Sequence, residues 1–138
     1  MNIDLRTPHN PESTKEAASL VAEGIRYLNY ATLGDAPGLD YPADAYSLLG
    51  ALCTATERMP QLFDQLSAFL STWQASGQLG DANGNDPNLR TAVAMARLAD
   101  ATLRAQQVDR ALQSAQNAIA GLYVAEGKSI TEGSDGNG

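Results

Sequence analysis

The sequence predicts an all-α protein, built as an antiparallel up-down helical bundle of three long helices. Apolar residues recur at alternating intervals of three and four over three long segments, which is the repeat of one helix face. Segments rich in glycine, proline, asparagine and aspartate separate these repeats, and no segment alternates as a strand does. We expect a flexible N-terminal segment at residues 1–9, one helical bundle domain at residues 10–125 and a disordered tail at residues 126–138.

The first predicted helix begins at Pro11, directly after Asn10, which has the side chain of an N-cap residue. Glutamates in its first turns complement the positive end of the helix dipole. Gly34 is the expected stop. The apolar face of this helix consists of Ala17, Val21, Gly24, Leu28 and Ala31.

The second predicted helix spans residues 42–76 and contains Pro60 in its interior. Proline has no N–H to donate, and its ring clashes with the preceding turn, so it breaks or kinks a helix. The apolar repeat nevertheless keeps its phase across this position, which predicts one helix kinked at Pro60. The repeat consists of Ala45, Leu49, Leu52, Thr56, Met59, Phe63, Leu66, Leu70 and Trp73.

The third predicted helix has Asp86 as its N-cap and Pro87 at its first position, and it runs to about Ala125. Several positions of its repeat are alanine, which lets a neighbouring helix approach closely. The repeat consists of Ala94, Leu98, Ala101, Ala105, Val108, Leu112, Ala115, Ile119 and Leu122.

The unequal helix lengths predict an exposed apolar patch. From the rise per residue, the second and third helices are about 52 and 57 Å long and the first only about 33 Å, so the first covers only part of the long pair. An uncovered patch of large apolar residues usually marks an interaction surface. We therefore predict a protein interface, and a homodimer in which two copies complete a four-helix bundle. Its residues on the second helix are Leu62, Phe63, Leu66, Phe69, Leu70 and Trp73.

Composition disfavours several kinds of partner. The chain of 138 residues has sixteen acidic and nine basic side chains and a net charge of −7. This balance disfavours nucleic acid and anionic membranes as partners, and no run reaches the roughly 18 apolar residues of a membrane span. The N-terminus shows no apolar leader segment and the chain has one cysteine, a pattern typical of a cytoplasmic protein.

The residues needed for catalytic or metal centres are few. His9 is the only histidine and Cys53 the only cysteine, so the usual zinc, Ser-His-Asp and Cys-His centres lack their components. No Glu-x-x-His pair and no phosphate-binding glycine motif are present. We predict that the protein is not an enzyme and uses no metal or cofactor. We expect His9 to be exposed and Cys53 to be a buried structural thiol.

One loop matches part of a calcium-binding motif. Asp81, Asn83 and Asn85 fit the first, third and fifth positions of an EF-hand loop. Asp86 stands where the motif requires glycine, and Ala92 stands where it requires a bidentate glutamate. This mismatch predicts a polar turn between two helices rather than a calcium site.

Three arginines, Arg90, Arg97 and Arg104, are spaced seven apart and therefore line one side of the third helix. Such a row can follow phosphate groups, which makes a nucleic-acid accessory factor the alternative function. Asp86 lies four residues before Arg90, and Asp100 lies between the other two arginines. A ladder of surface ion pairs is therefore the favoured interpretation.

Four of the five tyrosines flank the first predicted loop: Tyr27 and Tyr30 precede it, and Tyr41 and Tyr46 follow it. Tyr123, expected on the last turn of the third helix, would reach the same end of an antiparallel bundle. Tyrosine has an apolar ring and a polar hydroxyl, which suits both a packed bundle end and a protein interface. The four tyrosines at the loop are therefore candidate interface residues.

The segments "YLNYATLGDAPGLDYPADAYSLLGAL" and "NAIAGLY" resemble a group of short, uncharacterised all-helical actinobacterial proteins associated with plasmid-transfer genes. This resemblance implies an accessory protein of a mobile genetic element. The long hairpin is also similar to the WXG100 proteins of type VII secretion, which implies a secreted helical hairpin. Those proteins have Trp-x-Gly at the turn and Tyr-x-x-x-Asp/Glu after it. Here Trp73 is followed by Gly77 and Tyr123 by Glu126, so both motifs fail by spacing.

The function that these patterns favour is that of a non-enzymatic helical-bundle protein that binds another protein or a second copy of itself. A nucleic-acid accessory factor and a WXG100-like secreted hairpin are the alternatives. The absence of catalytic constellations and the excess of large apolar residues on the second helix support the first function.

Overall fold

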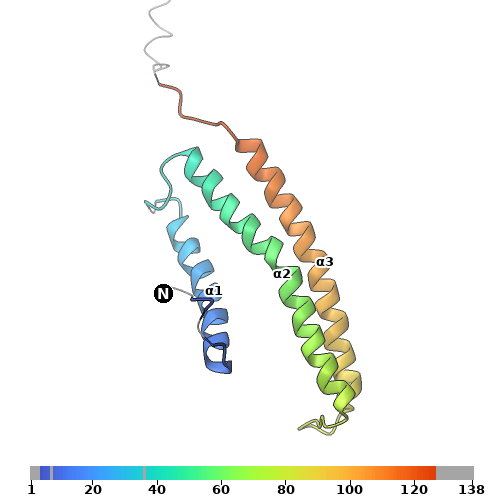
Figure 1. The fold of residues 1–138 in the computed structure, drawn as a ribbon. Helices are drawn as coiled ribbons and strands as arrows, with labels where there is room; N and C mark the ends of the chain where they lie inside the picture. Colours follow the sequence, from blue (N-terminus) through green and yellow to red (C-terminus); the bar gives the residue numbers. More distant parts are fainter. Residues whose placement is uncertain (1–3, 7, 36, 127–138) are drawn as a thin grey trace, which may run out of the picture. The chain divides into compact units, whose positions relative to one another are not determined.

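The structure, a computed structural model, describes residues 4–6, 8–35 and 37–126. Within these residues it contains three α-helices and no strand (Figure 1), which confirms the predicted all-α class. The helices are α1 (Pro11–Ala31), α2 (Pro42–Ser76) and α3 (Pro87–Ile119).

The chain divides into two compact units, Met1–Tyr41 and Pro42–Gly138. The first unit contains α1, and the second contains α2 and α3. Parts of the predicted flexible segment at residues 1–9, and the predicted tail from residue 127 onward, lie outside the described residues.

Helix α1 begins and ends with side-chain caps. The Asn10 side chain accepts a hydrogen bond from the Ser13 N–H at 2.8 Å, and the Ser13 hydroxyl accepts one from the Asn10 N–H at 3.2 Å. This capping box confirms the predicted start. At the other end, the N–H and the hydroxyl of Thr32 both donate to the carbonyl of Leu28, at 3.0 and 2.7 Å. The helix therefore ends before Gly34, where we expected it to stop.

Helix α2 passes through Pro60 without interruption (Figure 1), which confirms one helix over residues 42–76. The Thr56 carbonyl, four residues earlier, cannot receive the usual backbone hydrogen bond because Pro60 has no N–H. The hairpin therefore tolerates an interior proline because tertiary packing, rather than helix propensity alone, stabilises α2.

Helix α3 ends at Ile119, so the predicted end near Ala125 is wrong. Ala120 leaves the helical region with ψ of 128°, and Gly121 adopts a positive φ of 78°, a conformation that favours glycine. The apolar repeat continued to Leu122, but repetition alone does not reveal a glycine stop. Tyr123 consequently lies after the helix, where it is 81% exposed, and not on its last turn.

Helices α2 and α3 pack against each other along the second unit (Figure 1). Near the start of α2, Nε2 of Gln116 donates to the carbonyl of Tyr46 at 3.3 Å. Near its end, Nε2 of Gln74 donates to the carbonyl of Asn88 at 2.9 Å. Residue numbers rise along α2 as they fall along α3, so the two helices form an antiparallel hairpin, as predicted.

Candidate functional site

The contact surface between α2 and α3, here called the seam, has small and polar side chains at its most buried positions, and its larger apolar side chains are only half-buried. Its buried residues are Cys53, Thr56, Thr91 and Ala105. The Thr56 hydroxyl lies 3.3 Å from Oδ1 of Asp109 across the seam and also reaches the carbonyl of Cys53, at 3.0 Å. Among the described residues no large apolar side chain is fully buried. The hairpin therefore lacks a large hydrophobic core of its own.

The seam is displaced around α2 from the predicted repeat. Phe63 and Leu70 are half-buried, as expected, but Leu66 and Trp73 are exposed and the adjacent Ser67 and Gln74 are half-buried in their place. On α3, the predicted positions Val108 and Ala115 are likewise exposed, and Asp109 and Gln116 are half-buried. The predicted repeat was therefore wrong at these positions, because small and polar residues meet where large apolar ones were expected.

The large apolar residues displaced from the seam form a second apolar row on α2. Leu62, Leu66, Phe69 and Trp73 follow each other at intervals of four, three and four, so they lie on one side of the helix. Their exposed fractions are 53%, 44%, 60% and 43%. We call these four residues the α2 stripe. Of the six candidate interface residues on α2, these four are exposed, and Phe63 and Leu70 belong to the seam.

The arginine row forms fewer of the predicted ion pairs than expected. Arg97 contacts Asp100 at 3.2 Å, as predicted. Arg90 contacts Asp81 at 2.7 Å, and Asp86 instead accepts the N–H of Asn88 as the cap of α3, at 3.0 Å. The predicted pairing of Arg90 with Asp86 is therefore wrong, because Asp86 is occupied by the capping role.

The loop before α3 is organised by the carboxylate of Asp81. Its Oδ2 accepts hydrogen bonds from the N–H groups of Asn83 and Asn85, each at 3.0 Å, and its Oδ1 accepts from Arg90. The hydrogen bond from Asn85, then that from Asn83 and the charge of Arg90, lower the pKa of Asp81 below its ordinary value of 3.8. One carboxylate oxygen is thus bound by the loop backbone and the other by Arg90 of α3, in agreement with a polar turn instead of an EF-hand.

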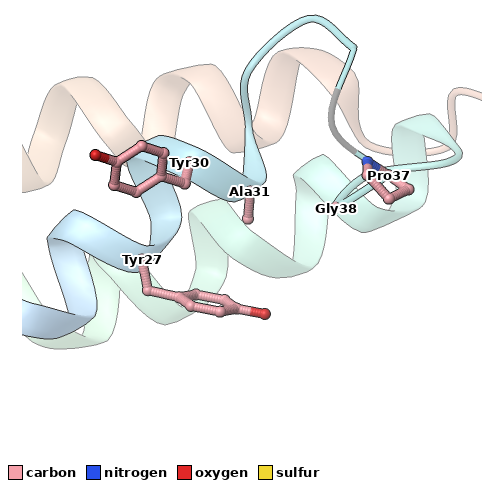
Figure 2. A pocket seen from close by; sticks show the side chains of 5 residues that line it. All are labelled: Tyr27, Tyr30, Ala31, Pro37 and Gly38. Carbon is pink, nitrogen blue, oxygen red and sulfur yellow. The ribbon is translucent and has the colours of Figure 1, made fainter.

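Two of the candidate tyrosines line a shallow hollow in the first unit (Figure 2). The hollow has a volume of about 280 Å³ and is lined by Tyr27, Tyr30, Ala31, Pro37 and Gly38. A Cβ atom at Gly38 would collide with the carbonyl oxygen of Ala31, so this close approach requires glycine. The hydroxyls of Tyr27 and Tyr30 point in different directions in Figure 2, so they do not converge on a common ligand atom. The hollow lacks the convergent polar groups of a ligand site.

The other two candidate tyrosines do not join the α2 stripe. Tyr41 is exposed at the end of the first unit. Tyr46 is exposed on α2, but its position lies about half a turn around the helix from Leu66 and Trp73. The expectation that the tyrosines gather at one pole stays a prediction.

Titratable groups outside the loop do not assemble a reactive centre in the described ranges. His9 is exposed and Cys53 is buried, both as expected. No group of three or more histidine, cysteine, aspartate or glutamate side chains within residues 4–6, 8–35 and 37–126 is placed to hold a metal ion. None of the described helices is long and apolar enough to cross a membrane.

No protein-family model, curated protein or solved structure matches this chain. The resemblance to plasmid-associated actinobacterial proteins therefore stays a prediction. The chemistry of the described residues, above all the exposed α2 stripe, is what remains to indicate function.

Proposed function

We propose that this protein is a non-enzymatic interaction protein whose α2–α3 hairpin binds another polypeptide through the α2 stripe. One observation carries the proposal: the four large apolar side chains of the α2 stripe are exposed, whereas the most buried positions of the seam hold small and polar side chains. A hairpin evolved to stand alone would place Leu66, Phe69 and Trp73 against α3, since their burial would stabilise it most.

The spacing of the stripe fits the docking of a helix. From Leu62 to Trp73 the stripe spans twelve residues, whose eleven steps give about 16 Å of helix. That is three turns, the length over which helix-in-groove recognition places its anchors at intervals of three and four. Trp73 and Phe69 are large aromatic side chains of the kind that dominates binding energy in interfaces.

A second copy of the chain is one form of this function, and it is the form that the sequence predicted. Two α2 stripes packed about a twofold axis would bury both and build a four-helix bundle from two hairpins. Self-association and the capture of a different protein share the same surface, so one experiment on that surface tests both.

A photo-crosslinking amino acid placed at Phe69 tests the proposal in cells. Its matched control is the same amino acid at Ser71, which is exposed and lies nearly half a turn around α2 from Phe69. We expect reproducible protein adducts, with this chain or with another, from position 69 and none of them from position 71. Adducts that form equally from both positions, or from neither, would show that the stripe is not a binding surface.

A further inference from the structure

We infer that the occupant of the α2 stripe is an amphipathic helix of a different polypeptide, with aspartate or glutamate bordering its apolar side. This inference rests on the proposed function and adds the chemistry of the partner. It follows from where the hairpin places its arginines.

The two faces of the hairpin can be told apart by Gln116. A Cβ atom at Gly50 would lie 2.8 Å from Nε2 of Gln116, so Gln116 reaches over the side of α2 that carries Gly50. The α2 stripe lies on the other flank of the seam, because Leu62 and Leu66 are about a third of a turn around α2 from the seam residue Ser67 in one direction, and Gly50 is about a third of a turn from it in the other. The hairpin thus has one face near Gly50 and another that carries the stripe, here called the stripe face.

The arginine row belongs to the stripe face. Arg97 and Arg104 lie about a quarter to a third of a turn from Gln116 around α3 in one direction, and Arg110 lies about a third of a turn from it in the other. In an antiparallel pair, the flank of α3 on that side adjoins the flank of α2 that bears the stripe. Arg90 shares this flank with them, and Arg58 lies one turn before Leu62 on α2.

Positive charge is therefore concentrated beside the apolar stripe of an acidic protein. Four of the five arginines on α2 and α3 lie on the stripe face, and the fifth, Arg110, lies on the other. Among Leu62–Trp73 and the α3 residues opposite, Asp100 is the one acidic residue beside the stripe, and Asp81 of the preceding loop pairs with Arg90. The chain as a whole has a net charge of −7, so this local excess of arginine opposes the overall balance.

The arginines of the stripe face retain N–H donors that can bind a partner. The Arg97 side chain is 78% exposed and gives a single nitrogen to Asp100 at 3.2 Å, although a guanidinium carries five N–H donors. Arg58 and Arg104 form no ion pair within the described part of the chain. Carboxylates accept arginine in bidentate geometry, so acidic side chains bordering an apolar helix complement this face.

The same charge pattern disfavours a second copy as the occupant. A twofold axis that brings two stripe faces together also brings two sets of arginines together, and like charges in an interface oppose association. Nucleic acid is disfavoured as well, because four exposed leucine, phenylalanine and tryptophan side chains interrupt a surface that would otherwise follow phosphates.

Two synthetic helical peptides test the partner chemistry on the intact chain. Both carry the same leucine stripe, bordered by glutamate in one peptide and by lysine in the other. We expect fluorescence anisotropy at low salt to give at least about tenfold tighter binding for the glutamate peptide, and a smaller difference as salt screens the charges.

Substitutions assign this preference to the stripe face. Phe69→Ala should weaken the binding of both peptides, because it removes an apolar anchor. Arg97→Glu combined with Arg104→Glu should abolish or reverse the preference for glutamate. Arg110→Glu reverses one charge on the other face, half of the change in the double variant, and should leave the preference for glutamate unchanged. Circular dichroism of each variant confirms that the helices are retained.

The remaining outcomes separate this inference from the proposed function. Equal affinity for the two peptides, weakened alike by Phe69→Ala, overturns the acidic partner but leaves protein binding by the stripe intact. If sedimentation velocity shows a dimer and Phe69→Ala dissociates it, the occupant is a second copy. That result also overturns the acidic partner and leaves protein binding by the stripe intact. Binding of neither peptide overturns the inference, and crosslinking at position 69 then decides the function separately. Binding of a DNA duplex that depends on the arginines but not on Phe69 overturns both.

Discussion

The substitution Phe69→Ala measures directly whether the α2 stripe is exposed in the folded protein. Truncation of a fully buried phenylalanine to alanine costs about 3–5 kcal/mol. Phe69 is 60% exposed, so about two fifths of that loss, about 1–2 kcal/mol, is expected. Alanine also has a better helix propensity than phenylalanine by about 0.5 kcal/mol. The expected net loss in the free energy of unfolding is therefore about 1 kcal/mol.

The same substitution at Phe63 is the matched control. Phe63 is the other phenylalanine of the chain, lies on the same helix and is half-buried on the seam side. Phe63→Ala should therefore cost more, about 2–3 kcal/mol. Urea unfolding followed by circular dichroism, at several protein concentrations, gives both values.

A larger loss in the free energy of unfolding for Phe69→Ala than for Phe63→Ala would refute this reasoning. If Phe69→Ala costs 3 kcal/mol or more at every concentration, another part of the same chain buries the stripe in solution. A cost that grows with protein concentration would instead show burial by a second copy.

Three further substitutions test the seam, the loop and the interior proline. Ala105→Leu should lower the free energy of unfolding by about 1–3 kcal/mol in urea titrations because it overpacks the seam, whereas Ala111→Leu, at an exposed position of α3, should be nearly neutral. The lowered pKa of Asp81 contributes stability that is present above the unfolded-state pKa of about 3.8 and is lost as the pH falls through the folded-state pKa. Asp81→Asn should therefore flatten the dependence of the urea midpoint on pH below about 4. An unchanged slope would contradict this. Pro60→Ala should raise the thermal midpoint, because it restores an N–H inside a continuous helix; a decrease would mean that the proline shapes the packing of α2.

Features set by neighbouring residues could be predicted from the sequence. Asn10 with Pro11 and Asp86 with Pro87 marked the starts of α1 and α3, because a cap needs only a side-chain acceptor and the next few N–H groups. The unbroken phase of the apolar repeat correctly indicated one helix across Pro60. The end of α3 could not be found from the same repeat, because the positive φ of Gly121 interrupts the helix while apolar residues continue.

Only the tertiary structure decided which side chains of α2 and α3 face each other in the hairpin. A helix places Leu66 and Ser67 about 100° apart, and the apolar repeat predicts that Leu66 faces α3. In the structure Ser67 and Gln74 face α3, and Leu66 and Trp73 are exposed beside them. Likewise, the choice of Arg90 between Asp86 and Asp81 depends on how the loop folds back on itself. Periodicity identifies the apolar positions of one helix, but contact between two helices depends on the shape and size of both surfaces. Here the small residues of α2 and α3 allow the two helices to approach more closely than the predicted apolar repeat would.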